Sequence, residues 1–96
     1  MPKYEVIWRG KARRAVEFEV PEKLAFAIYH FVTERLSENP QRLGKPLEGE
    51  AAGLHAARVS TYRIIYKIDE NEIVILVADV RHRAFVYAQN LKDLLD

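Results

Sequence analysis

The sequence predicts an α+β protein with a small, mostly meander antiparallel sheet of about four strands. Two N-terminal helices are expected on one face of the sheet, with a short helix at the C-terminus. Two observations lead to this class. A long segment after Pro21 repeats apolar residues at helical spacing, and three β-type segments separated by turns fill 54–80. The 96 residues, of which 49% are hydrophobic, suit a single domain over 1–96.

The first strand and the first helix are expected near the N-terminus. Side chains alternate along YEVIW, residues 4–8, as they do along a strand. The stretch GKARRAVEFEV, residues 10–20, fits a short helix through Ala12, Ala15 and Val16. Its last five residues also have the two-residue period of an extended segment.

A longer helix is expected to begin at Pro21. Proline is common at the first helical position, where its missing N–H would have no helical acceptor. Pro40 ends the helix, because the residue before a proline is driven out of the helical region. At roughly 15 residues, this helix is long enough to cover one face of a small sheet. Its apolar stripe consists of Leu24, Ala27, Ile28, Phe31, Val32 and Leu36.

A loop rich in glycine and proline, residues 41–53, leads into the β-type segments. Strands are expected at 54–59, 61–68 and 72–80, with turns at ST and DENE. The segment YAQNLKDLLD, residues 87–96, predicts a short amphipathic C-terminal helix. One face of the sheet would pack on the long helix, and the other would stay open.

The net charge of +1 says little about partners, but the distribution of charge says more. The basic residues of the segment 41–87 are Arg42, Lys45, Arg58, Arg63, Lys67, Arg81 and Arg83. Its acidic residues are Glu48, Glu50, Asp69, Glu70, Glu72 and Asp79, half of them in the DENE turn. Outside that turn the segment is basic, which points to a polyanionic partner.

Composition excludes several classes of site. The chain has no cysteine, so disulfides and thiolate metal sites are excluded. The three histidines are scattered and make no credible zinc site, so neither a metal nor a cofactor is expected, and His30 and His55 are expected to be structural. No stretch reaches the about 18 apolar residues of a membrane span, and the N-terminus lacks a signal-peptide pattern. The expected location is the cytoplasm, without a membrane partner.

Arg63 is the starting point of the candidate site. In YRIIYKI, Arg63 and Lys67 share the face of the strand that would be open. Pairing with the last strand brings a second cationic group beside Arg63. A three-residue hairpin loop would place Asp79 opposite Arg63 and Arg81 on its face, whereas a two-residue loop would place His82 there. The sequence leaves both registers open.

Clustered cations of this kind favour a bound anion. Like charges on neighbouring strands destabilise a sheet, and the planar arginine fork suits phosphate oxygens. Positive neighbours also favour the phenolate form of a tyrosine such as Tyr87. That phenolate would take a proton from a ribose 2′-hydroxyl while the arginines hold the pentavalent phosphorane. Arg42, Lys45 and Arg58 would follow the nucleic-acid backbone. This is the outline of a metal-free ribonuclease.

These residues together resemble the RelE superfamily of toxins from bacterial toxin–antitoxin pairs. The resemblance runs through NPQRLGKPL, GLHAAR, YRIIY and HRAFVY, in that order. It implies a single RelE-like toxin domain that cuts mRNA in the ribosomal A site by 2′-hydroxyl attack, without a metal. It also implies a RelB-like antitoxin partner, which would wrap this surface and displace the C-terminal helix. Operator DNA would be bound only by the toxin–antitoxin complex.

The resemblance implies roles for single residues. Arg63 matches the arginine that grips the scissile phosphate. Arg81 matches the arginine thought to protonate the leaving oxygen, and Arg83 is an adjacent candidate for that role. Tyr87 matches the tyrosine that acts as base or orients the 2′-hydroxyl. The remaining RNA-binding candidates are Arg42, Lys45, Arg58 and His82.

Two residues depart from the family pattern, and two other functions stay open. Ala56 stands where relatives carry a second lysine or arginine, and Asp79 adds a negative charge beside the site. A gyrase poison of the ParE branch would share the fold and the antitoxin without needing the arginines and the tyrosine. A catalytically weak toxin that acts mainly by binding its antitoxin would fit the two departures.

Overall fold

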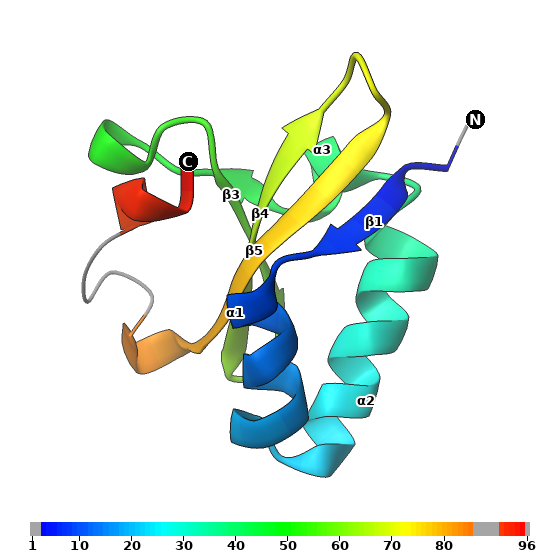
Figure 1. Ribbon diagram of the computed structural model, residues 1–96, viewed down its shortest axis with the longest axis vertical. Helices are drawn as coiled ribbons and strands as arrows, with labels where there is room; N and C mark the ends of the chain where they lie inside the picture. The colour runs from blue at the N-terminus through cyan, green and yellow to red at the C-terminus, as the bar shows by residue number, and fades with distance from the viewer. Residues whose placement is uncertain (1–2, 86–90, 96) are drawn as a thin grey trace.

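A twisted five-stranded sheet forms the centre of the computed structural model, which describes residues 3–85 and 91–95 (Figure 1). The strands are β1 (Glu5–Trp8), β2 (Lys45–Pro46), β3 (His55–Val59), β4 (Tyr62–Asp69) and β5 (Val74–His82). Their order across the sheet is β1-β5-β4-β3-β2. The expected α+β class is confirmed.

Two helical arms pack on one face of this sheet (Figure 1). They consist of α1 (Gly10–Arg14) with the π-helical segment η1 (Ala15–Glu19), and α2 (Glu22–His30) with the π-helical segment η2 (Phe31–Leu36). The other helical segments are α3 (Pro40–Leu43) and the 3₁₀ turns η3 (Gly49–Ala51), η4 (Arg83–Phe85) and η5 (Leu91–Leu95). The two N-terminal helices are thus confirmed, and the first of them covers the segment whose period was ambiguous.

The main core lies between the helical arms and the sheet. In the second arm, Ile28, Val32 and Leu36 of the apolar stripe are fully buried, whereas Ala27 is exposed. The stripe is therefore narrower than its spacing suggests. The buried members of this core are Ala12, Ala15, Val20, Ile28, Val32, Leu36, Ala57, Ile64, Tyr66, Ile75, Val77 and Val80.

The expectation of an open second face is wrong in part. Ile65 and Ala78 point apolar groups to that side, and the burial of such groups favours a cover. The cover comes from η3 and η5, which lie side by side at the upper left of Figure 1. Ala51 of η3 and Leu94 of η5, together with Leu54 just before β3, complete a small second core. The predicted C-terminal helix is a 3₁₀ turn in its described part, and residues 86–90 lie outside the described residues.

Both edges of the sheet differ from the expected antiparallel meander. The strand β1 lies parallel to β5, with Val6 beside Ile75. Alternation along four residues is the same in parallel and antiparallel strands, so the pattern could not reveal this direction. At the other edge, β2 arises inside the expected loop and pairs with β3. Pro46 fits this edge position because it has no N–H to donate.

A four-residue turn and a β-bulge set the register of the central hairpin. The turn runs from Asp69, which pairs with Val74, so β5 begins two residues later than predicted. The bulge faces Ile65 and Tyr66, where β5 contains one extra residue, Ala78. Its consequence is that Arg63 pairs directly with Arg81. Neither register considered from the sequence has this pairing, although one of them has Arg81 on the correct face.

A buried tyrosine holds the segment that leads to β2. The Tyr66 hydroxyl donates a hydrogen bond of 2.5 Å to the Pro40 carbonyl oxygen. The chain then passes Gly44, whose missing side chain leaves room for the same hydroxyl group. A hydrogen bond to a buried carbonyl fixes the start of α3 against the sheet. This contact places Lys45 beside β3.

Candidate nucleic-acid interface

Three arginines lie in register across three neighbouring strands. Arg58 of β3 pairs with Arg63 of β4, which pairs in turn with Arg81 of β5. Paired positions point to the same side of a sheet, and neighbouring strands lie about 4.8 Å apart. The arginine row, as we call Arg58, Arg63 and Arg81, therefore spans roughly 10 Å on the face opposite the helical arms. The predicted convergence of these residues is present in the structure.

A groove of about 820 Å³ is lined by Arg58 and Arg63 of the arginine row, whereas Arg81 does not line it. Lys45 of β2 pairs with Ala56, which stands two residues before Arg58 on β3, so Lys45 points to the same side. The groove is lined by Leu43, Lys45, Pro46, Leu47, Ala56, Arg58, Arg63 and Arg83. Four of these side chains are cationic and none is acidic. None of the four cations forms an ion pair within the described part of the chain.

Such a groove suits a phosphodiester chain. Unpaired guanidinium and ammonium groups attract phosphate oxygens, and arginine donates several hydrogen bonds in a fixed plane. Arg63 is half-buried, and its Nη1 donates to the carbonyl oxygen of Tyr62 at 3.3 Å. The lining also contains apolar side chains, among them Pro46 and Leu47, which are available for the flat face of a base or sugar.

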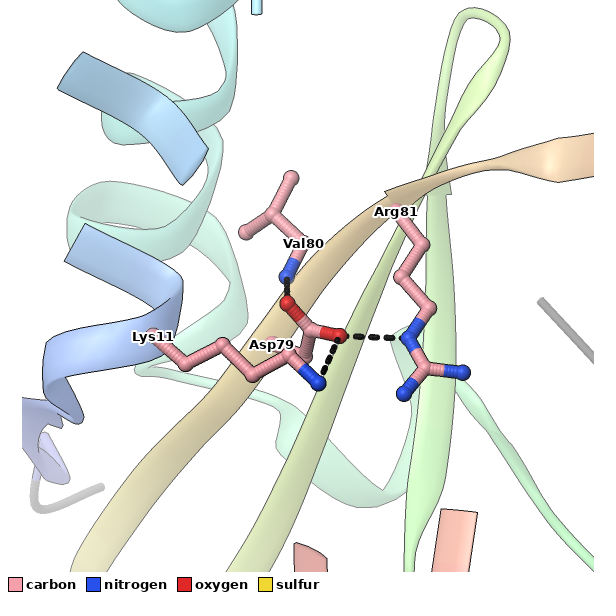
Figure 2. Close-up of polar contacts among 4 residues, drawn as sticks. All are labelled: Lys11, Asp79, Val80 and Arg81. Carbon is pink, nitrogen blue, oxygen red and sulfur yellow. Dashed lines mark hydrogen bonds and ion pairs between the residues drawn. The ribbon is translucent and has the colours of Figure 1, made fainter. Parts of the chain in front are cut away.

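Asp79 is buried beside the arginine row, and it is fully paired (Figure 2). One carboxylate oxygen, Oδ2, accepts a hydrogen bond from Nε of Arg81 and lies 3.6 Å from Nζ of Lys11. The other, Oδ1, accepts from the backbone N–H of Val80 at 2.8 Å. The negative charge predicted near the site is therefore bound by two cations and one amide.

The remaining candidates are placed differently. His82 pairs with Tyr62 on the side of the helical arms, where the two ring centroids lie 5.4 Å apart in an edge-to-face arrangement. The register that placed His82 beside Arg63 is therefore wrong. Arg83 is exposed and lines the groove, and its backbone N–H donates to Thr61 at 2.7 Å. Arg42 is exposed on α3 and does not line the groove. Tyr87 lies outside the described residues.

The titratable groups of the interior have structural surroundings. Burial raises the pKa of Tyr66, whose hydroxyl bonds to Pro40. Burial also lowers the pKa of His55, whose ring stacks on Tyr66. Within the described residues, no group of histidine, aspartate and glutamate side chains could hold a metal ion. No helix in this part of the chain has the length and apolar character needed to cross a membrane.

Comparison with known proteins gives the family of the chain. Residues 7–87 match the family model of the ParE toxin of the type II toxin–antitoxin system parDE. The chain belongs to this family. It is therefore a member of the RelE/ParE superfamily of toxins, and the resemblance drawn from the motifs is confirmed.

Two relatives within the superfamily are toxins of Mycobacterium tuberculosis. Toxin RelG is 38% identical over 84 residues, which cover 88% of this chain and 95% of RelG. Toxin RelE of the same organism is 38% identical over 87 residues, which cover 91% of this chain and 89% of the relative. The crystal structure of the toxin–antitoxin complex RelBE2 from M. tuberculosis contains a chain that superposes on this one with a TM-score of 0.82. The two chains are 38% identical, and the match covers 88% of this chain and 95% of the other.

Lys11 lies beside the candidate site of this ParE-family chain, and the sequence did not suggest it. It lies on α1, far along the chain from Asp79, and no local spacing links the two. The apolar lining residues Leu43, Pro46 and Leu47 were equally hidden, because only the edge strand β2 brings this segment beside the arginines. A clue was available in the basic character of GKARR at residues 10–14.

Proposed function

We propose that this toxin is a ribosome-dependent mRNA endonuclease that needs no metal ion. One observation supports the proposal above others: the three arginines of the row lie in register, and Arg58 and Arg63 line a groove whose described residues include four cations and no acid. Positive groups fixed in advance stabilise the charge that develops on a phosphorane, and they need no rearrangement at the moment of reaction. The ribosomal A site and the mRNA substrate rest on the resemblance to RelE-type toxins.

In the proposed reaction, the 2′-oxygen of a ribose attacks the adjacent phosphorus. A new P–O2′ bond forms, the P–O5′ bond breaks, and the products are a 2′,3′-cyclic phosphate and a 5′-hydroxyl end. The proton of the 2′-hydroxyl passes to a Tyr87 phenolate, while Arg81 or Arg83 supplies a proton to the departing 5′-oxygen. Arg63 and Arg58 hold the non-bridging oxygens. Exchange with solvent restores both proton states.

A RelB-like antitoxin is the proposed protein partner. The M. tuberculosis relative of known structure is a complex of a toxin with its antitoxin. A partner that covers Arg58 and Arg63 with acidic side chains would compete directly with RNA, since both bind the same charges. We propose that operator DNA is bound only by this complex.

The test is expression of the chain without its antitoxin, followed by mapping of the 5′ ends of cellular mRNA. We expect growth arrest and new 5′-hydroxyl ends within codons. Arg63→Ala should slow cleavage about 100-fold, the usual effect of removing one group that binds developing charge. Tyr87→Phe should relieve growth arrest as well. Full toxicity of both variants in folded protein would contradict the proposed site.

Lys67→Ala is the matched control for Arg63→Ala. Lys67 is exposed on the same strand and face, four residues further on, and does not line the groove. Its removal changes the net charge by the same amount. Cleavage should therefore stay at the wild-type level. An equal loss in both variants would mean that overall charge, rather than the arginine row, determines activity.

A gyrase poison is the second candidate, because the matching family model is that of the ParE toxin. The same expression experiment separates the two candidates. Broken chromosomal DNA with intact mRNA would support the gyrase poison and contradict the endonuclease. Such a poison would not require the register of Arg58, Arg63 and Arg81.

A further inference from the structure

Asp79 is an unusual neighbour for a row of cations. Its side chain faces the same side as Arg81, two residues further along β5, and the residue is only 3% exposed. Burying a carboxylate is costly unless it is paired and hydrogen-bonded. Asp79 meets both conditions through Arg81, Lys11 and the Val80 amide. Its surroundings are thus built to retain a negative charge at this position.

The carboxylate binds Arg81 at the nitrogen nearest to the side-chain stem. Figure 2 shows Nε of Arg81 directed at the Asp79 carboxylate and the two terminal nitrogens beyond Nε, one of them pointing away from Asp79. A hydrogen bond at Nε fixes the plane of the guanidinium group, because this group is rigid beyond that atom. The Arg81 side chain is only 10% exposed, so packing restricts it further.

Lys11 balances the charge of this arrangement. A single carboxylate beside Arg81 would cancel the charge of that arginine, and phosphate would be attracted less. With Lys11 at 3.6 Å from the same oxygen, the group of Lys11, Asp79 and Arg81 has a formal charge of +1. The positive character at this end of the arginine row is therefore preserved while Arg81 is held.

We propose that Asp79 is a positioning residue, which fixes Arg81 so that its terminal amino groups face a phosphate held at Arg63. The inference rests on the proposed function. It assigns different roles to the arginine row, because Arg58 and Arg63 bind by charge while Arg81 is oriented for the chemical step. Asp79 itself touches neither the RNA nor the reacting atoms.

Asp79→Asn separates positioning from simple attraction. The variant removes a negative charge near the groove, so affinity for an RNA oligonucleotide with a 2′-deoxy residue at the cleavage position should stay equal or rise. Single-turnover cleavage of mRNA on ribosomes should fall by up to about 100-fold, the loss expected when a reacting group is misplaced. A merely structural role would weaken binding and cleavage together. That parallel loss would overturn the proposal, as would unchanged cleavage.

Two further variants complete the design. In an Arg81→Ala background, Asp79→Asn should cause no additional loss of cleavage, because residues that act as a unit are not additive. An additional loss would show that Asp79 acts by another route. Glu72→Gln is the control, since Glu72 is an exposed acid of the β4–β5 turn. It should leave both binding and cleavage unchanged.

Nuclear magnetic resonance gives a readout that does not depend on activity. In the wild-type chain, the Nε–H proton of Arg81 should exchange slowly with water, and Asp79→Asn should make this exchange fast. Unchanged exchange would overturn the proposal. A different outcome would separate the two proposals. If Asp79→Asn abolishes the slow exchange but the wild-type protein does not cleave mRNA on ribosomes, the Asp79–Arg81 contact is established and the proposed function is contradicted.

Discussion

His55 illustrates how strongly one side chain depends on its surroundings. Its ring stacks on Tyr66 with the centroids 5.5 Å apart, and its Nδ1 atom has no hydrogen-bond partner within the described residues. Burial lowers the pKa of His55 from its ordinary 6.5, because the imidazolium form would lose water without gaining an acceptor. The expectation of a structural role for this histidine agrees with its place on β3, where its ring packs on Tyr66 of β4.

This burial predicts a pH-dependent stability. Below about pH 6.5, His55 binds a proton more readily in the unfolded chain than in the folded chain. Protonation therefore favours unfolding, and the free energy of unfolding falls as the pH drops below this value. Urea midpoints at pH 7.5 and 5.5 measure the effect. His55→Gln should lose less stability than the wild type between these values. An equal loss would assign the pH dependence to other groups.

The segment from α3 to β2 depends on one packing contact, between Gly44 and Tyr66. A Cβ atom at Gly44 would overlap the Tyr66 hydroxyl, and the Ala56 carbonyl oxygen would be 3.0 Å away. Both neighbours are held, the first by its bond to Pro40 and the second by the strand. We therefore expect a larger side chain at position 44 to displace Lys45 from the groove.

Gly44→Ala is expected to reduce the free energy of unfolding by about 1–3 kcal/mol, as overpacking of a filled site does. The measurement is urea denaturation followed by circular dichroism. Gly10→Ala is the matched control, because its added methyl group would have no atom within 4 Å apart from its chain neighbours and the backbone of its own helix. A wild-type midpoint for Gly44→Ala would show that the loop moves away from Tyr66 at little cost.

At the level of elements, strands and helices followed from side-chain periodicity, but their register did not. The apolar stripe of α2 and η2 predicts its own burial through Ile28, Val32 and Leu36. The pairing of Arg63 with Arg81 in the arginine row depends on a bulge at Ala78. The bulge could not be predicted, because alanine is not a residue type that indicates a bulge. Asp79 and Lys11 meet only because α1 packs on β5, a contact between remote segments.

On the scale of the whole molecule, charge is distributed unevenly although the net charge is only +1. The exposed acids of the β4–β5 turn lie at one end of the hairpin, and the arginine row lies toward the other. Local fields of this kind govern association with polyanions more than the overall charge does. The low net charge is thus compatible with a nucleic-acid partner.

Salt dependence tests this view. Each phosphate contact contributes a slope of about 0.7 to the fall of log affinity with log salt for single-stranded RNA. Arg58→Ala should therefore lower the slope measured with an RNA oligonucleotide by about this amount. Lys67→Ala, outside the groove, should leave the slope unchanged. Identical slopes for the wild type and Arg58→Ala would remove Arg58 from the interface.

The positions of Arg58, Arg63 and Arg81 on three different strands have a consequence for the newly made chain. No single stretch of the polypeptide holds these charges together, so a nascent or misfolded molecule carries all three without gathering them. Under the proposed function, RNA cleavage would begin only when β3, β4 and β5 have paired in their final register. An antitoxin could therefore bind the chain before the site has formed. A protease that cuts the turn between β4 and β5 would inactivate the protein without cutting near any arginine.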